Sequence, residues 1–199
     1  MADPVKPGWR ARAILIIIAL SAVIPFGLAW YYSKHPELID KTSNYGTLII
    51  PARQLDMNQV LGQPVSTPAG AKDAHGRWIL LQIVSASCEQ ACTETLHKTH
   101  QGWLMLNKEM PRVNRVLLVT PNAKVEESEP VKADDALVVS KVNLAILQTV
   151  TDALGKAPEA GSVILVDPLG NLVLWYAPGF DPYLMVKDLK HLLKASQIG

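Results

Sequence analysis

The sequence is poor both in residues that would bind a polyanion and in residues that carry redox chemistry. Its 199 residues include 19 lysines and arginines against 18 aspartates and glutamates, with no basic cluster. This balance excludes nucleic acid as an expected partner. Only two cysteines are present, Cys88 and Cys92, so any thiol or soft-metal chemistry depends on that pair. The sequence has no internal repeat, and the roughly 150 residues after the membrane-like start suffice for one cored domain.

Charged residues are absent from Ala13 to Tyr32. Twenty helical residues span about 30 Å, which is the thickness of a bilayer core. Lys6, Arg10 and Arg12 precede this stretch, and an excess of basic residues marks the cytoplasmic side of a membrane. We therefore predict a cytoplasmic N-terminus over 1–12, a transmembrane anchor over 13–32, a stalk and lead-in over 33–59, and an exported domain over 60–199.

A cleaved signal peptide is the alternative interpretation of the apolar stretch. Gly27-Leu28-Ala29 has the small-x-small pattern of a cleavage site. The stretch continues into Trp30, Tyr31 and Tyr32, however, and aromatic residues are typical of a membrane interface. This favours an uncleaved anchor. No arginine- and serine-rich segment, which would indicate transit to an organelle, precedes the stretch. We therefore expect an anchor in a bacterial inner membrane and a domain in the periplasm, a compartment in which disulfides form.

The exported part alternates between strand and helix patterns. Its predicted elements are a buried strand over 78–84, a helix over 89–108, a strand over 113–120, a helix marked by Leu144, Leu147, Val150 and Leu154, strands over 162–166 and 172–176, and a last helix capped by Asp181. Residues 54–76 are expected to be an irregular lead-in with a short hairpin, and the acidic segment 121–135 a solvated loop. This order predicts an α/β domain of thioredoxin-like arrangement.

Cys88 and Cys92 directly follow the first predicted strand. Residues four apart on a helix share one face and lie about 6 Å apart along its axis, which suits the roughly 4.4–6.8 Å between the Cα atoms of a disulfide. Two thiolates at this spacing also suit Cu(I), a soft ion that prefers sulfur. A structural disulfide is the alternative, but a bridge that closes so short a loop stabilises little. Redox exchange or metal binding is therefore the leading hypothesis for the pair.

Spacing does not identify a third metal ligand. His100 lies eight residues after Cys92, about 12 Å along an ideal helix, and His97 lies off the face of the cysteine. His35, His75 and His191 fall in the stalk, in a turn before the first strand and in the last helix. We therefore interpret His97 and His100 as surface or helix-face residues.

The chain resembles the Sco/SenC family of copper-delivery and assembly proteins for cytochrome oxidase. The resemblance rests on the N-terminal anchor, the strand 78–84, the Cys88-x-x-x-Cys92 spacing and the segment 163–171, Val-Ile-Leu-Val-Asp-Pro-Leu-Gly-Asn. It implies a thioredoxin-like domain whose cysteines bind copper or exchange disulfides at an oxidase copper site, with an oxidase subunit or other assembly factors as partners. The family's copper-binding histidine has no counterpart here, because its place is taken by Glu159-Ala160-Gly161-Ser162.

Two other functions compete with oxidase assembly. A general thiol–disulfide oxidoreductase commonly has two residues between its cysteines and a cis-proline before the third strand, whereas this chain has three intervening residues and Ser162-Val163 at that place. A non-catalytic anchored binding module would leave the cysteine pair structural, with Trp103, Trp175 and Tyr176 as core or partner-contact residues. An assembly factor is expected rather than an enzyme that turns over a substrate.

Overall fold

The computed structural model describes residues 8–35, 44–61, 64–66, 75–85, 88–121, 123, 125, 131 and 134–196. The chain divides into two compact units, residues 1–43 and residues 44–199. Each unit is described by itself below, beginning with the N-terminal helix.

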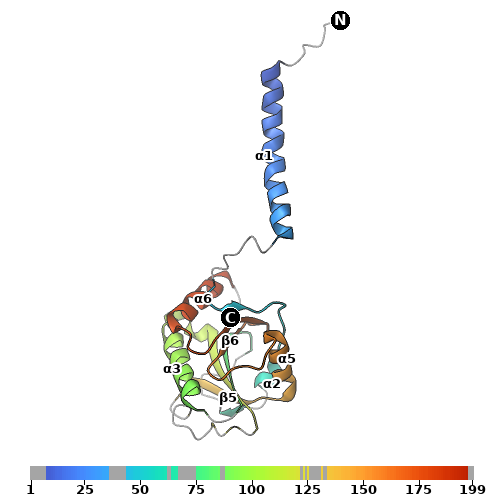
Figure 1. Ribbon diagram of the computed structural model, residues 1–199. Coiled ribbons are helices and arrows are strands. Elements are labelled where there is room, and N and C mark those ends of the chain that lie inside the picture. The colour runs from blue at the N-terminus through green and yellow to red at the C-terminus, as the bar shows by residue number, and fades with distance from the viewer. Residues whose placement is uncertain are drawn as a thin grey trace. The chain divides into compact units, whose positions relative to one another are not determined.

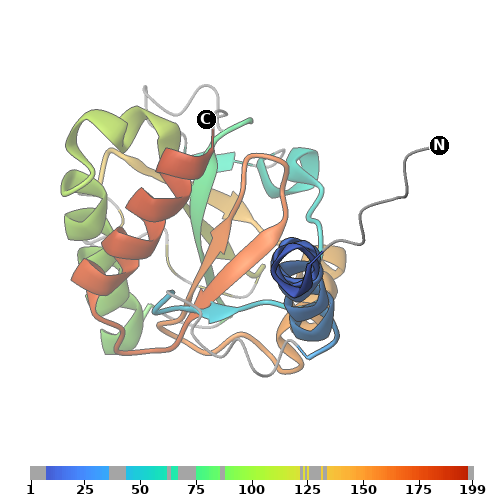
Figure 2. The same cartoon turned by 90° about the horizontal axis from the view of Figure 1, so that it is seen from above.

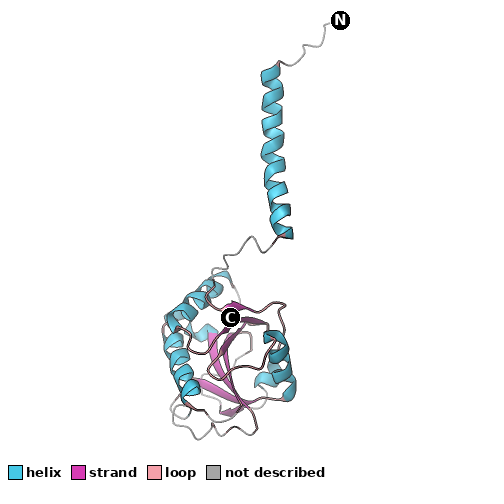
Figure 3. Ribbon diagram, viewed as in Figure 1, coloured by secondary structure: helices cyan, strands magenta, loops and turns pink. Residues whose placement is uncertain are grey.

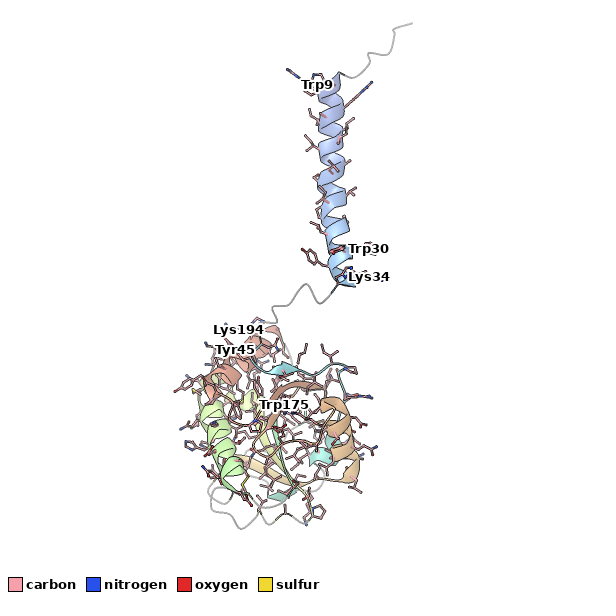
Figure 4. All side chains as sticks on the ribbon, in the orientation of Figure 1. Trp9, Trp30, Lys34, Tyr45, Trp175 and Lys194 are labelled. Atoms are coloured by element: carbon pink, nitrogen blue, oxygen red, sulfur yellow. A yellow bond between two sulfur atoms is a disulfide. The ribbon has the colours of Figure 1, made fainter. Side chains whose placement is uncertain are left out.

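The N-terminal unit contains one long helix, α1, from Trp9 to Lys34. The segment Arg12–Lys34 has a mean hydropathy of 2.5 and is long and apolar enough to cross a membrane. Trp9 and Trp30 lie near opposite ends of the helix (Figure 4). Its side chains are exposed along its length, and a helix satisfies its own backbone polar groups, as a lipid-exposed segment must. The predicted anchor 13–32 thus lies within a helix that meets the requirements of a membrane span.

The second unit is built on a seven-stranded mixed sheet (Figures 1 and 3). Across the sheet the strands are β1 (Thr47–Leu48), β7 (Leu172–Tyr176), β6 (Val163–Val166), β3 (Trp78–Val84), β4 (Val113–Val119), β5 (Leu137–Lys141) and β2 (Pro64–Ser66). Strand β3 pairs in parallel with β4 and antiparallel with β6, so the strand that leads to the cysteines is central. Strands β6 and β7 form the C-terminal antiparallel hairpin.

Helices cover both faces of this sheet (Figure 2). Helices α3 (Gln90–Leu104) and α6 (Pro182–Ala195) cover one face, and α2 (Met57–Leu61) and α5 (Leu144–Leu154) cover the other. Every residue of β3 is buried, which explains why its sequence is a continuous apolar run rather than an alternating one. Ile79, Leu81 and Ile83 of β3 therefore pack in the core on one side of the sheet, while Trp78, Leu80 and Val84 pack in apolar clusters on the other side.

The order β3–α3–β4 followed by α5–β6–β7–α6 is the thioredoxin-like arrangement, as the sequence predicted. Asp181 accepts a hydrogen bond from the Tyr183 backbone N–H and caps α6, and Gly155 ends α5 with a left-handed φ of 68°. Lys187, Lys190 and Lys194 are exposed on α6, as expected from its amphipathic pattern.

Several predicted elements need correction. Helix α3 ends at Leu104 rather than at 108, and the chain continues as a 3-10 helix, η2, over Asn107–Arg112. Strand β5 was not predicted at all. Its neighbour β2, in the supposedly irregular lead-in, pairs antiparallel with β5 rather than within a local hairpin. Leu144 is 84% exposed, because Ile146 and Val150 rather than Leu144 carry the buried face of α5.

Asp188 of helix α6 forms hydrogen bonds with the first residues of this unit. Its carboxylate is 5% exposed and accepts hydrogen bonds from the backbone N–H groups of Tyr45 and Gly46, each at 2.9 Å, and from the Tyr176 hydroxyl at 3.0 Å. Three donors offset the desolvation of a buried carboxylate. The segment that leads into β1 is thus fixed against α6 through one side chain.

Tyr176 should make the domain sensitive to alkali. Burial, and then the neighbouring charge of Asp188, raise the pKa of the Tyr176 hydroxyl. A raised pKa in the folded state stabilises the fold below the unfolded value near 10 and loses that stabilisation as the pH rises above it. We expect the free energy of unfolding to fall by about 1 kcal/mol between pH 9 and pH 11 from this group.

The measurement is urea unfolding of the full chain in detergent across that pH range. Tyr176→Phe should be less stable than the wild type at pH 8, because it lacks the hydrogen bond to Asp188, and the difference should shrink above pH 10. Tyr183→Phe is the matched control, since Tyr183 is 67% exposed, and it should follow the wild type. A constant gap between Tyr176→Phe and the wild type at every pH would contradict the assignment.

Candidate functional site

Cys88 and Cys92 form a disulfide, with their Cα atoms 5.1 Å apart. Cys88 lies in the segment between β3 and α3, and Cys92 lies in the first turn of α3. The predicted helix over 89–108 left Cys88 just before its first residue, and in the structure α3 begins one residue later, at Gln90, with Glu89 as its N-cap residue. The pair lies at the junction of the central strand and a helix N-terminus, as the sequence indicated.

The two cysteines differ in burial. Cys88 is half-buried, whereas Cys92 is 3% exposed and packs among the apolar side chains of Val84, Leu96 and Leu117. An external thiolate can therefore reach Cys88 but not Cys92. The partial positive charge at the N-terminus of α3 is opposed by the acidic side chains of Glu89 and Glu94, so electrostatics do not activate the pair strongly. The asymmetry in burial is what exchange chemistry needs: one sulfur that a partner can attack and one that is protected.

The backbone before β6 packs closely against the first turns of α3. The Thr95 hydroxyl donates a 2.9 Å hydrogen bond to the Gly161 carbonyl. Gly161 has a φ of +83°, and a Cβ at this position would lie 3.2 Å from the Ala91 carbonyl oxygen. Only glycine meets both conditions without strain. The chain thus presents bare backbone to the helix that carries Cys92, within the segment 159–162 that takes the place of the histidine in the Sco/SenC resemblance and directly before the place of the oxidoreductase proline.

No third metal ligand accompanies the two sulfurs among the residues that the structure describes. Within that part of the chain, no three side chains of the His, Cys, Asp and Glu types are grouped so that they could hold a metal ion. His97 is exposed, and His100 faces Asp134 and Arg115 instead. The predicted metal ligands Cys88 and Cys92 alone do not complete the three-ligand copper site that the family resemblance implies.

A buried ion pair contacts the middle of α3. Arg115 of β4 is 1% exposed and pairs with Asp134. Its guanidinium also donates to the Leu96 carbonyl at 2.9 Å and to the Thr99 hydroxyl at 3.1 Å. Burial lowers the pKa of Arg115, and the charge of Asp134 partly offsets this effect. Asp134 was expected in a solvated loop, and that prediction is wrong because its carboxylate balances this buried charge. The acidic residues 126, 127 and 129 of the same predicted loop lie outside the described residues.

Sequence reasoning missed one residue next to the cysteines. Gln82 is 3% exposed, and its side-chain amide donates a 3.3 Å hydrogen bond to the Cys92 carbonyl. The sequence feature that could have identified Gln82 is that it is the single amide in the otherwise apolar strand Trp-Ile-Leu-Leu-Gln-Ile-Val. A polar side chain in a strand that is buried on both faces needs a partner, and here that partner belongs to the cysteine pair.

The fold and this site define a thioredoxin-like domain with a disulfide at the start of its first core helix. Residues 78–196 match the family described as "transmembrane-like, thioredoxin-like, C-terminal domain". The chain belongs to this family. No protein of curated function matches the sequence.

Solved structures similar to this chain include both Sco/SenC proteins and thiol–disulfide oxidoreductases. Copper-bound ScoI from Arabidopsis thaliana is 15% identical, with a TM-score of 0.47, over 63% of this chain and 89% of that one. A SCO1/SenC family lipoprotein from Bacillus anthracis is 19% identical, with a TM-score of 0.46, over 61% and 84%. The thioredoxin domain of a thiol-disulfide oxidoreductase from Bacteroides vulgatus is 18% identical, with a TM-score of 0.44, over 72% and 96%.

Proposed function

We propose that this protein is a Sco-like assembly factor, anchored in a bacterial inner membrane, that exchanges disulfides with the copper site of a cytochrome c oxidase in the periplasm. The disulfide between a half-buried Cys88 and a buried Cys92 carries the proposal. Helix α1, which is long and apolar enough to cross a membrane, supports the location. The family resemblance supports the partner, because its motifs surround the same two cysteines.

The exchange uses Cys88 as the attacking sulfur and Cys92 as the resolving sulfur. In the reduced protein, the Cys88 thiolate attacks a partner disulfide, so that a Cys88–partner bond forms while the partner's own bond breaks. The released partner sulfur takes up a proton. Cys92 then loses its proton and attacks the Cys88 sulfur, which closes the intramolecular disulfide and releases the second partner sulfur as a thiol. Two electrons thus pass from the pair to the partner, and a dithiol of another exported oxidoreductase returns the pair to the reduced state.

Copper handling is the alternative use of the same cysteines. Two sulfurs can hold Cu(I) in near-linear fashion, or a partner can supply the third ligand. In the described part of the chain, no further His, Cys, Asp or Glu side chain joins the two sulfurs as a metal ligand. This favours disulfide exchange as the principal role. Titration of the reduced full chain with Cu(I) separates the two roles, since one bound ion per chain that is lost in Cys88→Ser would favour copper handling.

The proposed function is tested by deleting the gene in its source bacterium and measuring assembled cytochrome c oxidase. We expect oxidase activity to fall at least about tenfold, to return with the wild-type gene, and to stay low with Cys88→Ser or Cys92→Ser. A Ser85→Ala gene serves as control, because Ser85 is an exposed residue close to the pair. Normal oxidase in the deletion strain would overturn the oxidase assignment. Full rescue by both cysteine variants would instead indicate a non-catalytic binding module.

A further inference from the structure

Gln82 brings an amide group to the buried side of the cysteine pair. It shares the α3-facing side of β3 with Leu80 and Val84, because alternate residues of a strand point to the same face. Its amino group donates to the Cys92 carbonyl at 3.3 Å. The orientation of the amide follows from chemistry, since a carbonyl only accepts hydrogen bonds and must face the amino group. The amide oxygen, Oε1, is therefore the free end.

That oxygen is buried and has no hydrogen-bond partner within the described portion of the chain. A buried acceptor without a partner destabilises the state of the protein in which it occurs. In the oxidised protein the neighbouring Cys92 has no proton to offer, because its sulfur is bonded to Cys88. Reduction changes this, since it leaves an S–H group on Cys92, a residue that is buried in the domain core.

We propose that Gln82 is a third member of the redox site, whose Oε1 accepts a hydrogen bond from the Cys92 thiol when the pair is reduced. The inference rests on the proposed exchange function and adds a residue to it. When a dithiol donor reduces the pair, the Cys88–Cys92 bond breaks, two electrons and two protons enter, and the donor becomes a disulfide. One of those protons resides on the Cys92 sulfur, and Gln82 supplies the acceptor that water cannot provide there.

The predicted consequence is a pair that is easier to reduce. The hydrogen bond stabilises the reduced state, and the unsatisfied oxygen destabilises the oxidised state, so both effects raise the reduction potential. Removing the amide should reverse both of them. Gln82→Leu should therefore lower the equilibrium constant for reduction by about tenfold, which corresponds to a potential about 30 mV more negative.

The test equilibrates the full chain, in detergent, with a reference dithiol couple and measures the reduced fraction by alkylation and mass spectrometry. Gln82→Leu and the volume-conserving Gln82→Met should both shift the midpoint to more negative potential. If one of the two variants fails to fold, the other still tests the proposal. Leu80→Ala is the matched control: it creates a cavity on the same face of the same strand and should lower stability while leaving the midpoint unchanged.

Two failures can be told apart. If the wild-type pair exchanges with the couple but neither Gln82 variant shifts the midpoint relative to Leu80→Ala, the role of Gln82 is wrong and the proposed exchange function stands. If the wild-type pair does not exchange with any couple while the protein stays folded, the proposed function itself fails.

Discussion

Asp134→Asn should lower the free energy of unfolding of the thioredoxin-like domain by about 3–5 kcal/mol, because it removes the counter-charge of a fully buried arginine. Arg115 is 1% exposed, and its remaining partners include the Leu96 carbonyl and the Thr99 hydroxyl, which carry no charge. Asparagine keeps the shape of the side chain but not its charge. The loss should also loosen α3, since Arg115 joins this helix to β4 and to the segment before β5.

Urea unfolding monitored by tryptophan fluorescence measures this effect on the full chain in detergent. Asp135→Asn is the matched control, because Asp135 is the exposed neighbour in the same segment, and it should change stability by less than about 0.5 kcal/mol. Replacing both members of the pair, as Arg115→Met with Asp134→Leu, should be less destabilising than Asp134→Asn alone. Equal stability of Asp134→Asn and Asp135→Asn would show that the buried ion pair is unimportant.

Cys92→Ser should trap the physiological partner as a stable mixed disulfide through Cys88. Without Cys92 the second half of the exchange is impossible, so the covalent complex that normally resolves should accumulate. Cys88→Ser should trap at least about tenfold less, since the remaining sulfur is buried and reaction of a thiol depends on access. The difference between the two variants follows directly from the 3% exposure of Cys92.

Non-reducing electrophoresis of membranes from cells that carry each variant detects such complexes, and mass spectrometry identifies the trapped protein. The double variant Cys88→Ser/Cys92→Ser is the control for bands that arise without the pair. An oxidase subunit in the Cys92→Ser complex would support the proposed partner. Equal trapping by both single variants would contradict the assignment of Cys88 as the attacking sulfur.

Local patterns in the sequence predicted the elements that are governed by local physics. Strand β3 was recognisable because a strand buried on both faces is continuously apolar. Helix α6 was recognisable because Asp181 caps it and its lysines repeat on the water-facing side. The order of these elements then sufficed to predict the thioredoxin-like arrangement and to place the cysteine pair at the end of the central strand.

The missed features depend on partners that are distant in the sequence. Strand β5 is an exception, because it is as long as β7 and its residues Leu-Val-Val-Ser-Lys contain a local apolar signal, although its pairing with β4 and β2 could not be inferred from that signal. Asp134 looked like one acid among several in a polar segment, and its partner Arg115 lies 19 residues earlier. The signal that remained was a lone arginine within the apolar run 113–119. Gln82 gave a similar signal in β3, and both polar residues prove to contact helix α3.

The most direct test of the central claim is a redox titration of Cys88 and Cys92 in the folded full chain. The protein is equilibrated in detergent over a range of reduced-to-oxidised ratios of a dithiol couple, the two cysteines are alkylated and counted by mass spectrometry, and circular dichroism monitors the fold. A reversible exchange pair predicts one two-electron transition in which both cysteines become reduced together while the fold persists. A disulfide that resists reduction until the domain unfolds would contradict the proposal and identify Cys88–Cys92 as a purely structural bridge.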